Sequence, residues 1–129
     1  QTKVYENKNV LPRAFFVQEV INVKDKKEAI KRLMDRKFDP SKQVVSENAR
    51  SAQNISVGKS EIIEYSENKV VIHTQNNETG QLVLTDIFYP GWNARVDGVE
   101  TKIYDADFIF RTVFVPGGEH TVEFYATLF

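Results

Sequence analysis

Four aspartates lie near the ends of strand-like segments in the second half of the chain: Asp86, Asp97, Asp105 and Asp107. Paired carboxylates can perform the acid and base steps of glycoside hydrolysis, and their separation sets the stereochemical outcome. Aspartates at turns more often accept hydrogen bonds from backbone N–H groups, and we expect that role here. The sequence also lacks the spaced oxygen-ligand loop of a calcium site. We therefore predict no catalytic residue and no metal site.

The two histidines, His73 and His120, are not spaced as metal ligands. The chain has no cysteine, which excludes disulfides and thiolate metal sites. It also lacks the short motifs of serine hydrolases, zinc proteases and phosphate-binding loops. We expect structural roles for both histidines and no cofactor.

Trp92, the only tryptophan, follows Tyr89 and a Pro-Gly pair. An aromatic ring at a loop rim can stack on a sugar, but a tryptophan over the end of a sandwich more often caps the core. Arg95 and Asp97 are two residues apart, so one strand would place them on one face. Ion pairing is the default expectation for them, with Arg13 and Arg111 as candidate cross-strand partners. If the chain binds a ligand, the candidate residues are Tyr89, Trp92, Arg95 and Asp97.

Short segments rich in β-branched and aromatic residues must position these side chains. The predicted strands are 13–23, 43–47, 60–66, 69–75, 81–89, 93–96, 99–104, 108–115 and 119–125. Asp97-Gly98 is a strong hairpin-turn signal between two of them. Short strands at this spacing are typical of a sandwich or a barrel.

One segment has helical periodicity instead. Asp25 is a candidate N-cap, with Glu28 three residues later as in a capping box. Apolar residues then recur at helical spacing: Ala29, Ile30, Leu33 and Met34. Pro40 disfavours helix at the residue before it. We predict a helix over 26–36 with one apolar face on a sheet, and a mainly β fold: an antiparallel β-sandwich with one flanking N-terminal α-helix.

Composition narrows the class of protein. The chain has 129 residues, 41% of them hydrophobic, which suits one globular domain. Its 17 basic and 18 acidic residues give a net charge of −1 and no basic excess for nucleic acid. No apolar run is long enough to span a membrane. We predict one soluble domain over 1–129. Because the sequence starts without Met and ends on apolar residues, we expect it to be cut from a larger protein.

Residues 86–98, D-I-F-Y-P-G-W-N-A-R-V-D-G, resemble the D-x-x-Y-P-G-W-x-x-x-V-D-G signature of the YfhO family of bacterial multi-spanning membrane proteins. Three further segments agree with the family pattern in the same order. They are Y-E-N with L-P-R-A-F over 5–15, D-x-x-F-D-P over 35–40, and V-P-G-G-E-H-x-V-x-F over 115–124. The resemblance covers nearly the whole chain.

This resemblance implies an extracytoplasmic domain from the C-terminal part of a larger bacterial membrane protein. The membrane portion of that parent would be similar to glycosyltransferases that use lipid-linked sugars. Some family members are linked to glycosylation of lipoteichoic acid. In such glycosyltransferases the catalytic carboxylate lies in an early loop between membrane helices, so the resemblance carries no catalytic residue over to this chain. The expected function is a non-catalytic accessory domain whose partner is the membrane-embedded portion of the same parent chain. A glycan or lipid-linked sugar is a candidate ligand.

Three alternatives remain open at this point. The chain could be a stand-alone carbohydrate-binding β-sandwich, a purely structural domain, or a small glycoside hydrolase that uses Asp86 and Asp97.

Overall fold

The computed structural model describes residues 12–86, 91–107 and 109–127. Eleven strands and one helix occur in this part of the chain. In chain order they are β1 (Ala14–Val17), β2 (Glu19–Asn22), α1 (Lys26–Leu33), β3 (Gln43–Ser46), β4 (Lys59–Tyr65), β5 (Lys69–Asn76), β6 (Gly80–Leu84), β7 (Trp92–Val96), β8 (Val99–Thr101), β9 (Tyr104–Ala106), β10 (Phe110–Val115) and β11 (Gly118–Ala126). The fold is mainly β, as predicted.

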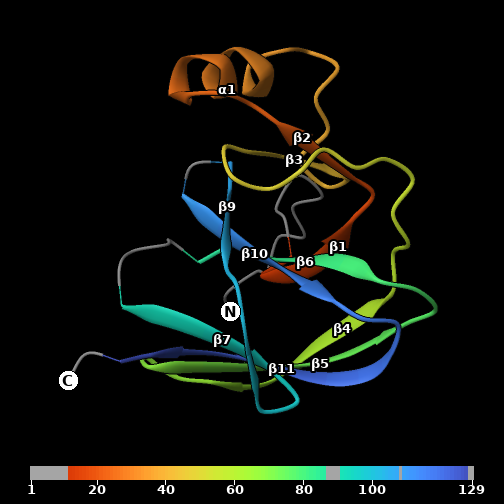
Figure 1. Ribbon diagram of the computed structural model, residues 1–129, viewed down its shortest axis with the longest axis vertical. Coiled ribbons are helices and arrows are strands. Elements are labelled where there is room, and N and C mark those ends of the chain that lie inside the picture. The colour runs from red at the N-terminus through yellow and green to blue at the C-terminus, as the bar shows by residue number, and fades with distance from the viewer. Residues whose placement is uncertain (1–11, 87–90, 108, 128–129) are drawn as a thin grey trace, which may run out of the picture.

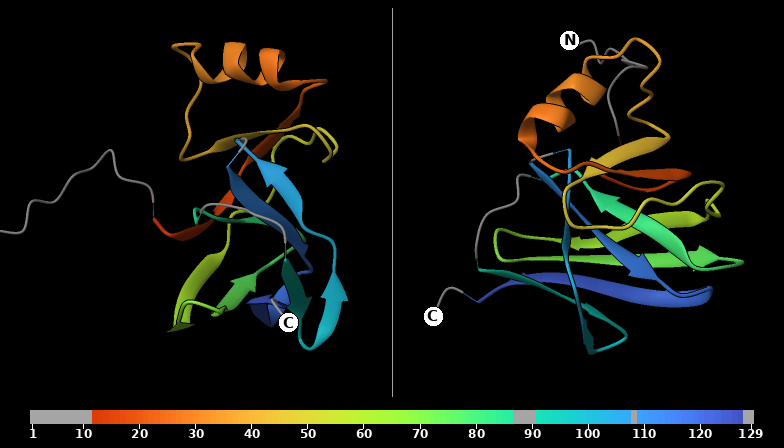
Figure 2. Two further views of the ribbon diagram at one scale, coloured as in Figure 1. Left: turned by 90° about the vertical axis from the view of Figure 1, so that its left-hand side faces the viewer. Right: turned by 45° about the horizontal axis from the view of Figure 1, so that its top comes forward.

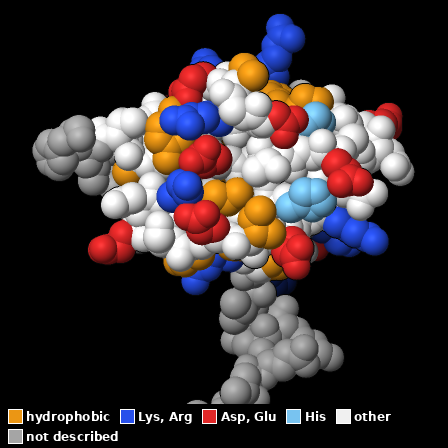
Figure 3. Space-filling model, turned by 90° about the horizontal axis from the view of Figure 1, so that it is seen from below, with side chains coloured by type: hydrophobic (Ala, Val, Ile, Leu, Met, Phe, Trp, Pro, Cys, Tyr) orange, Lys and Arg blue, Asp and Glu red, His pale blue; other side chains and the backbone are white. Residues whose placement is uncertain are grey.

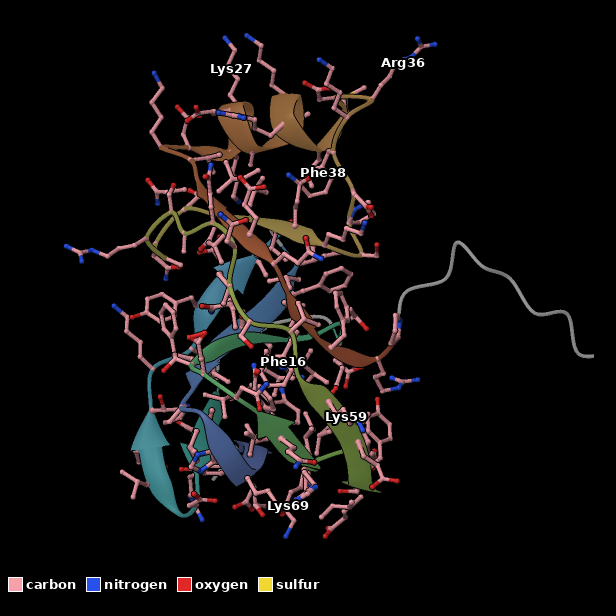
Figure 4. The ribbon with its side chains drawn as sticks, turned by 90° about the vertical axis from the view of Figure 1, so that its right-hand side faces the viewer. Phe16, Lys27, Arg36, Phe38, Lys59 and Lys69 are labelled. Atoms are coloured by element: carbon pink, nitrogen blue, oxygen red, sulfur yellow. The ribbon has the colours of Figure 1, made fainter. Side chains whose placement is uncertain are left out.

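Two antiparallel sheets pack face to face and form the sandwich (Figure 1). The larger sheet has the order β4-β5-β11-β7-β8, and the smaller has the order β1-β6-β10-β9. Apolar side chains from both inner faces fill the space between them, including Phe16, Ile72, Leu82 and Phe124. Phe16 is visible between the sheets in Figure 4. This shared core supports the predicted antiparallel β-sandwich.

A third layer covers the other face of the smaller sheet. Strands β2 and β3 form a parallel pair, and α1 lies above them at the top of Figures 1 and 2. A second apolar cluster, which includes Val17, Val44 and Val83, joins this layer to the smaller sheet. Every residue of β6 is therefore buried, since both faces of that strand are covered.

The helix begins where the sequence predicts. The Asp25 carboxylate accepts a hydrogen bond from the Glu28 N–H at 2.9 Å, and the Glu28 carboxylate accepts one from the Lys24 N–H at 2.8 Å. The prediction was wrong in two respects. The helix ends at Leu33 rather than at 36, and Ile30 and Met34 are exposed. Only the row with Ala29 and Leu33 faces β3, because an eight-residue helix above a two-stranded sheet can bury only a narrow stripe.

Two predicted strands are divided in the structure. The segment 13–23 breaks at Gln18, since β1 pairs with β6 whereas β2 pairs with β3 in a different layer. The segment 99–104 divides into β8, in the larger sheet, and β9, in the smaller sheet. In both cases the chain changes sheets, which a continuous run of strand-forming residues does not reveal.

The predicted hairpin at Asp97-Gly98 is confirmed. Both residues have positive φ, 51° and 82°, and they join β7 to β8 in antiparallel register. An Asp-Gly pair adopts these angles readily, which explains the turn. Within the described ranges, no helix is long and apolar enough to cross a membrane.

Candidate functional site

Strand β7 separates the residues predicted to act together. Trp92, Ala94 and Val96 face the core between the two sheets, so the intervening Asn93 and Arg95 lie on the opposite face of the larger sheet. Trp92 and Asp97 stand at opposite ends of the strand, about 16 Å apart along it. Tyr89 lies outside the described residues. The described candidates therefore do not form one binding site.

Trp92 lies on a buried arginine. The Arg111 guanidinium carbon is 4.4 Å from the centre of the Trp92 ring and 5.5 Å from that of Phe124. Arg111 is only 1% exposed, although it is charged at every physiological pH. Stacking on two aromatic faces compensates part of the hydration that this cation loses on burial. Trp92 therefore covers the core, as predicted, and also helps to hold a charge inside it.

Asp86 joins Arg111 to the rim of the sandwich. One oxygen of its carboxylate is 3.8 Å from the Arg111 guanidinium, and the other is 2.8 Å from the Arg13 guanidinium. The Tyr65 hydroxyl donates a hydrogen bond to Asp86 at 2.9 Å, while the Arg13 guanidinium lies over the Tyr65 ring. Burial, followed by this hydrogen bond to Asp86, raises the pKa of Tyr65. We call these residues the Asp86 cluster: Arg13, Tyr65, Asp86, Trp92 and Arg111.

A shallow pocket opens at the Asp86 cluster. Its described lining consists of Tyr65, Ser66, Glu67, Thr85, Asp86, Trp92 and Arg111. Strands β4, β7 and β10 supply Tyr65, Trp92 and Arg111, whereas Asp86 follows the end of β6. Aromatic surface, a carboxylate and a guanidinium are groups that can stack on a sugar ring and bind its hydroxyls. Two described residues of the predicted signature, Asp86 and Trp92, line this pocket.

Arg95 belongs to a separate group on the outer face of the larger sheet. Its guanidinium lies 3.9 Å from the centre of the Tyr125 ring, 3.2 Å from Glu100 and 3.5 Å from Glu123. The Tyr125 hydroxyl also donates a hydrogen bond to Glu100. We call these residues the Glu100 cluster: Arg95, Glu100, Glu123 and Tyr125. Lys69 extends it, since it pairs with Glu123 at 3.7 Å and with Glu64 at 3.6 Å.

Alternating charges therefore cross all five strands of that sheet. Figure 3 views this face and shows acidic and basic side chains mixed with apolar ones rather than one patch of a single sign. The ion pairing expected of Arg95 is confirmed, with Glu100 and Glu123 as its partners. The predicted cross-strand partners Arg13 and Arg111 bind Asp86 instead. Arg111 lies on β10 and Arg13 directly precedes β1, and both strands belong to the smaller sheet.

Asp97 has the turn role predicted for it. Its carboxylate accepts hydrogen bonds from the Thr121 N–H at 2.8 Å and from His120 Nδ1 at 2.5 Å. His120 Nε2 lies 2.9 Å from the Gly117 carbonyl oxygen. The bond to Asp97, followed by the one to Gly117, raises the pKa of His120, whereas the bond from His120 most strongly lowers the pKa of Asp97. This pair ties the β7–β8 turn to the start of β11.

Asp105 and Asp107 connect the sandwich to β3 and the loop after it. Asp105 accepts hydrogen bonds from the Glu47 N–H at 3.0 Å and from the Asn48 N–H at 3.2 Å. Asp107 accepts one from the Val45 N–H at 2.8 Å. Burial is the main reason that the pKa of Asp107 rises to about 6, and the nearby Asp105 charge adds to the rise. Both carboxylates bind backbone, as the sequence analysis expects for aspartates at turns.

His73 pairs with Glu119 at 3.3 Å on the outer face of the larger sheet. Within the described part of the chain, no group of three or more metal-binding side chains comes together.

Two residues of the Asp86 cluster were not predicted as site residues: Arg111 at its centre, which was expected only to form a cross-strand ion pair, and Tyr65, one of its two aromatic groups. One signal was available for Arg111. It lies within a largely apolar, strand-like run over 108–115, where burial would require compensation from a carboxylate or an aromatic face.

Searches against family models, curated proteins and solved structures gave no significant match to this chain. The resemblance to the YfhO family therefore stays a prediction. The motif nearest the N-terminus, over 5–15, lies mostly in residues 5–11, outside the described residues.

Proposed function

We propose that this chain is a non-catalytic, extracytoplasmic accessory domain of a polytopic membrane protein of the YfhO type. Its partner is the membrane-embedded portion of the same parent chain, and the end of the sandwich with the Asp86 cluster faces that partner. There it would help to shape the acceptor site of a glycosyltransferase-like reaction on a cell-surface polymer such as lipoteichoic acid.

One observation carries the proposal: both ends of the described chain meet at the Asp86 cluster. Arg13, next to the first described residue, binds Asp86 and accepts a backbone hydrogen bond from Thr85. Thr127, the last described residue, donates its N–H to the Gly91 carbonyl oxygen at 2.7 Å, beside Trp92. Figure 1 shows the C-terminal end of β11 beside the start of β7. The described chain therefore enters and leaves the fold at the end that carries the signature residues.

The arrangement of charge supports an interface at this end. Two residues of the signature, Asp86 and Trp92, contact the buried Arg111. A recognition surface is more precise when neighbouring groups hold its side chains in place. The charges of the outer face are instead paired with one another in the Glu100 cluster.

The coding sequence around this segment gives the first test. We expect upstream sequence for several apolar segments of about 20 residues each, the length that crosses a bilayer. An upstream region without such segments would overturn the family assignment.

The second test uses the full-length parent in cells. We expect deletion of residues 12–127 to lower glycosylation of the surface polymer while the abundance of the parent is maintained. Loss of abundance would assign the domain a purely structural role, and unchanged glycosylation would overturn the accessory role. Asp86→Asn should reproduce part of the defect, whereas Glu100→Gln, a matched change on the outer face, should not.

A second candidate function is carbohydrate binding by the domain alone. The pocket at the Asp86 cluster favours it, because Tyr65 and Trp92 place two aromatic groups beside a carboxylate. A glycan array with the wild type, Tyr65→Ala and the control Tyr125→Ala tests it. Binding that is lost only in Tyr65→Ala would support the module, and an array without wild-type binding would eliminate it.

A further inference from the structure

Positive charge is concentrated around α1. The α1 segment, residues 24–42, contains eight basic and four acidic residues, a net charge of +4. The other residues of the chain, nine basic and fourteen acidic, have a net charge of −5. The small net charge of the whole chain therefore hides a strong separation of sign. Figure 4 shows Lys27 and Arg36 extending away from the body of the molecule at this end.

The cations of the α1 segment are not neutralised within the fold. Of the ion pairs found between described residues, none includes a basic residue of the segment. In contrast, Lys69 and Arg95 of the larger sheet each pair with two carboxylates. The basic side chains around α1 are therefore available to an external anion.

The same surface also exposes apolar side chains. Ile30 is 48% exposed and Met34 is 78% exposed, and the two lie one helical turn apart. The helical repeat places Lys27 and Lys31 beside them on the outer side, opposite the row with Ala29 and Leu33 that faces β3. Apolar tips bordered by lysines are the pattern of a helix that lies in the interface of a membrane.

We propose that this outer face of α1 binds an anionic lipid surface. Ile30 and Met34 enter the boundary between headgroups and acyl chains, while Lys27 and Lys31 contact headgroup phosphates. Charge complementarity favours an anionic partner, and the exposed apolar pair favours a bilayer over a soluble polyanion, which offers no apolar phase. This proposal is independent of the function proposed above, since α1 lies in a different layer from the Asp86 cluster.

Sedimentation of the 129-residue chain with vesicles tests the proposal. We expect binding to vesicles of phosphatidylglycerol and phosphatidylcholine, weaker binding as salt rises, and little binding to phosphatidylcholine alone. Lys27→Glu with Lys31→Glu should weaken binding by at least about 30-fold, since each basic residue near an anionic surface contributes about fivefold. Ile30→Ser with Met34→Ser should weaken it on the order of tenfold.

The matched control is Lys59→Glu with Lys102→Glu, which changes the net charge equally at two exposed lysines outside the α1 segment. It should retain vesicle binding. Equal losses in both charge-reversal variants would overturn the proposal, because net charge alone would then explain binding. Absence of wild-type binding to the anionic vesicles would also overturn it. Full binding by the serine variant would overturn the insertion of Ile30 and Met34, because charge attraction alone would then explain vesicle binding. Circular dichroism and thermal unfolding verify that each variant is folded.

Discussion

The molecule contains the same combination of side chains twice, in two different environments. In both the Asp86 cluster and the Glu100 cluster, an arginine lies over a tyrosine ring and pairs with a carboxylate. In both, the tyrosine hydroxyl donates a hydrogen bond to that carboxylate. The environments differ greatly, because the Asp86 side chain is 19% exposed and that of Glu100 is 61% exposed.

The two carboxylates also differ in their cationic partners and in their place in the fold. Asp86 also faces Arg111, which is buried between the sheets, whereas the Glu100 cluster lies on the outer face of the larger sheet. Water and salt screen charges at the surface, so an exposed pair contributes little to stability. A buried charge that loses a partner is far more costly. The same three kinds of group, a guanidinium, a phenol and a carboxylate, should therefore contribute differently to stability in the two clusters.

The largest difference should appear on removal of an aromatic ring. We expect Trp92→Ala to lower the free energy of unfolding by about 3 kcal/mol, because it removes core packing and one of the faces on which Arg111 stacks. Tyr125→Ala should cost less than about 1 kcal/mol. Chemical denaturation of the two variants measures both values. Equal losses would mean that Arg111 and its aromatic partners are not a stabilising unit.

Neutralising each carboxylate tests the electrostatic side of the comparison. We expect Asp86→Asn to destabilise the protein by about 2 kcal/mol, since the Arg111 guanidinium then faces a neutral amide. Glu100→Gln should change stability by less than about 0.5 kcal/mol. Thermal unfolding at low and high salt provides the measurement. If the stability loss caused by Asp86→Asn depended strongly on salt and that caused by Glu100→Gln did not, the assignment of Asp86 as the buried carboxylate and Glu100 as the exposed one would be contradicted.

Asp107 extends the comparison to a half-buried carboxylate beside another acid. Its pKa is raised to about 6, so the folded state binds the proton more tightly than the unfolded state. Stability should therefore fall as pH rises from about 4 to about 6, by about 1–2 kcal/mol. Asp107→Asn should remove this loss, and asparagine tolerates the positive φ of 50° at this position. Denaturation at several pH values measures the slope, and an unchanged slope in the variant would exclude Asp107 as its source.

The smallest effect belongs to the exposed pair of Asp97 and His120. The raised pKa of His120 stabilises the fold at pH values below about 6.5, and this contribution is lost as pH rises through the raised value. The lowered pKa of Asp97 stabilises the fold at pH values above about 4, and this contribution is lost as pH falls through the lowered value. The pair therefore stabilises the fold most strongly between these two pH values. We expect Asp97→Asn to lower the pKa of His120 in an NMR titration, and an unchanged value would show that Gly117 alone sets it.

Local chemistry made several features predictable from the sequence. The N-cap at Asp25 and the hairpin at Asp97-Gly98 each depend on a few adjacent residues, and both are confirmed. The end of α1 was not predictable in this way. Helical periodicity continues through Met34, but the narrow surface of β2 and β3 offers no partner for Ile30 and Met34.

The candidate site was harder to predict, because its parts come from both sheets. Strand alternation alone would have shown that Trp92 and Arg95, three residues apart, point to opposite faces. No local pattern could have paired Asp86 with Arg13 and Arg111, which lie 73 and 25 positions away in the sequence.

The sequence by itself determined the fold class, the N-cap of α1, the hairpin turn at Asp97-Gly98 and the separation of charge around α1. These follow from composition and from interactions between near neighbours in the chain. Only the tertiary structure decided which arginine is buried, which carboxylates it and its neighbours contact, and which face of β7 meets the core. Those outcomes depend on how two sheets pack, since burial changes the free energy of a charge far more than the identity of its neighbours in the sequence does.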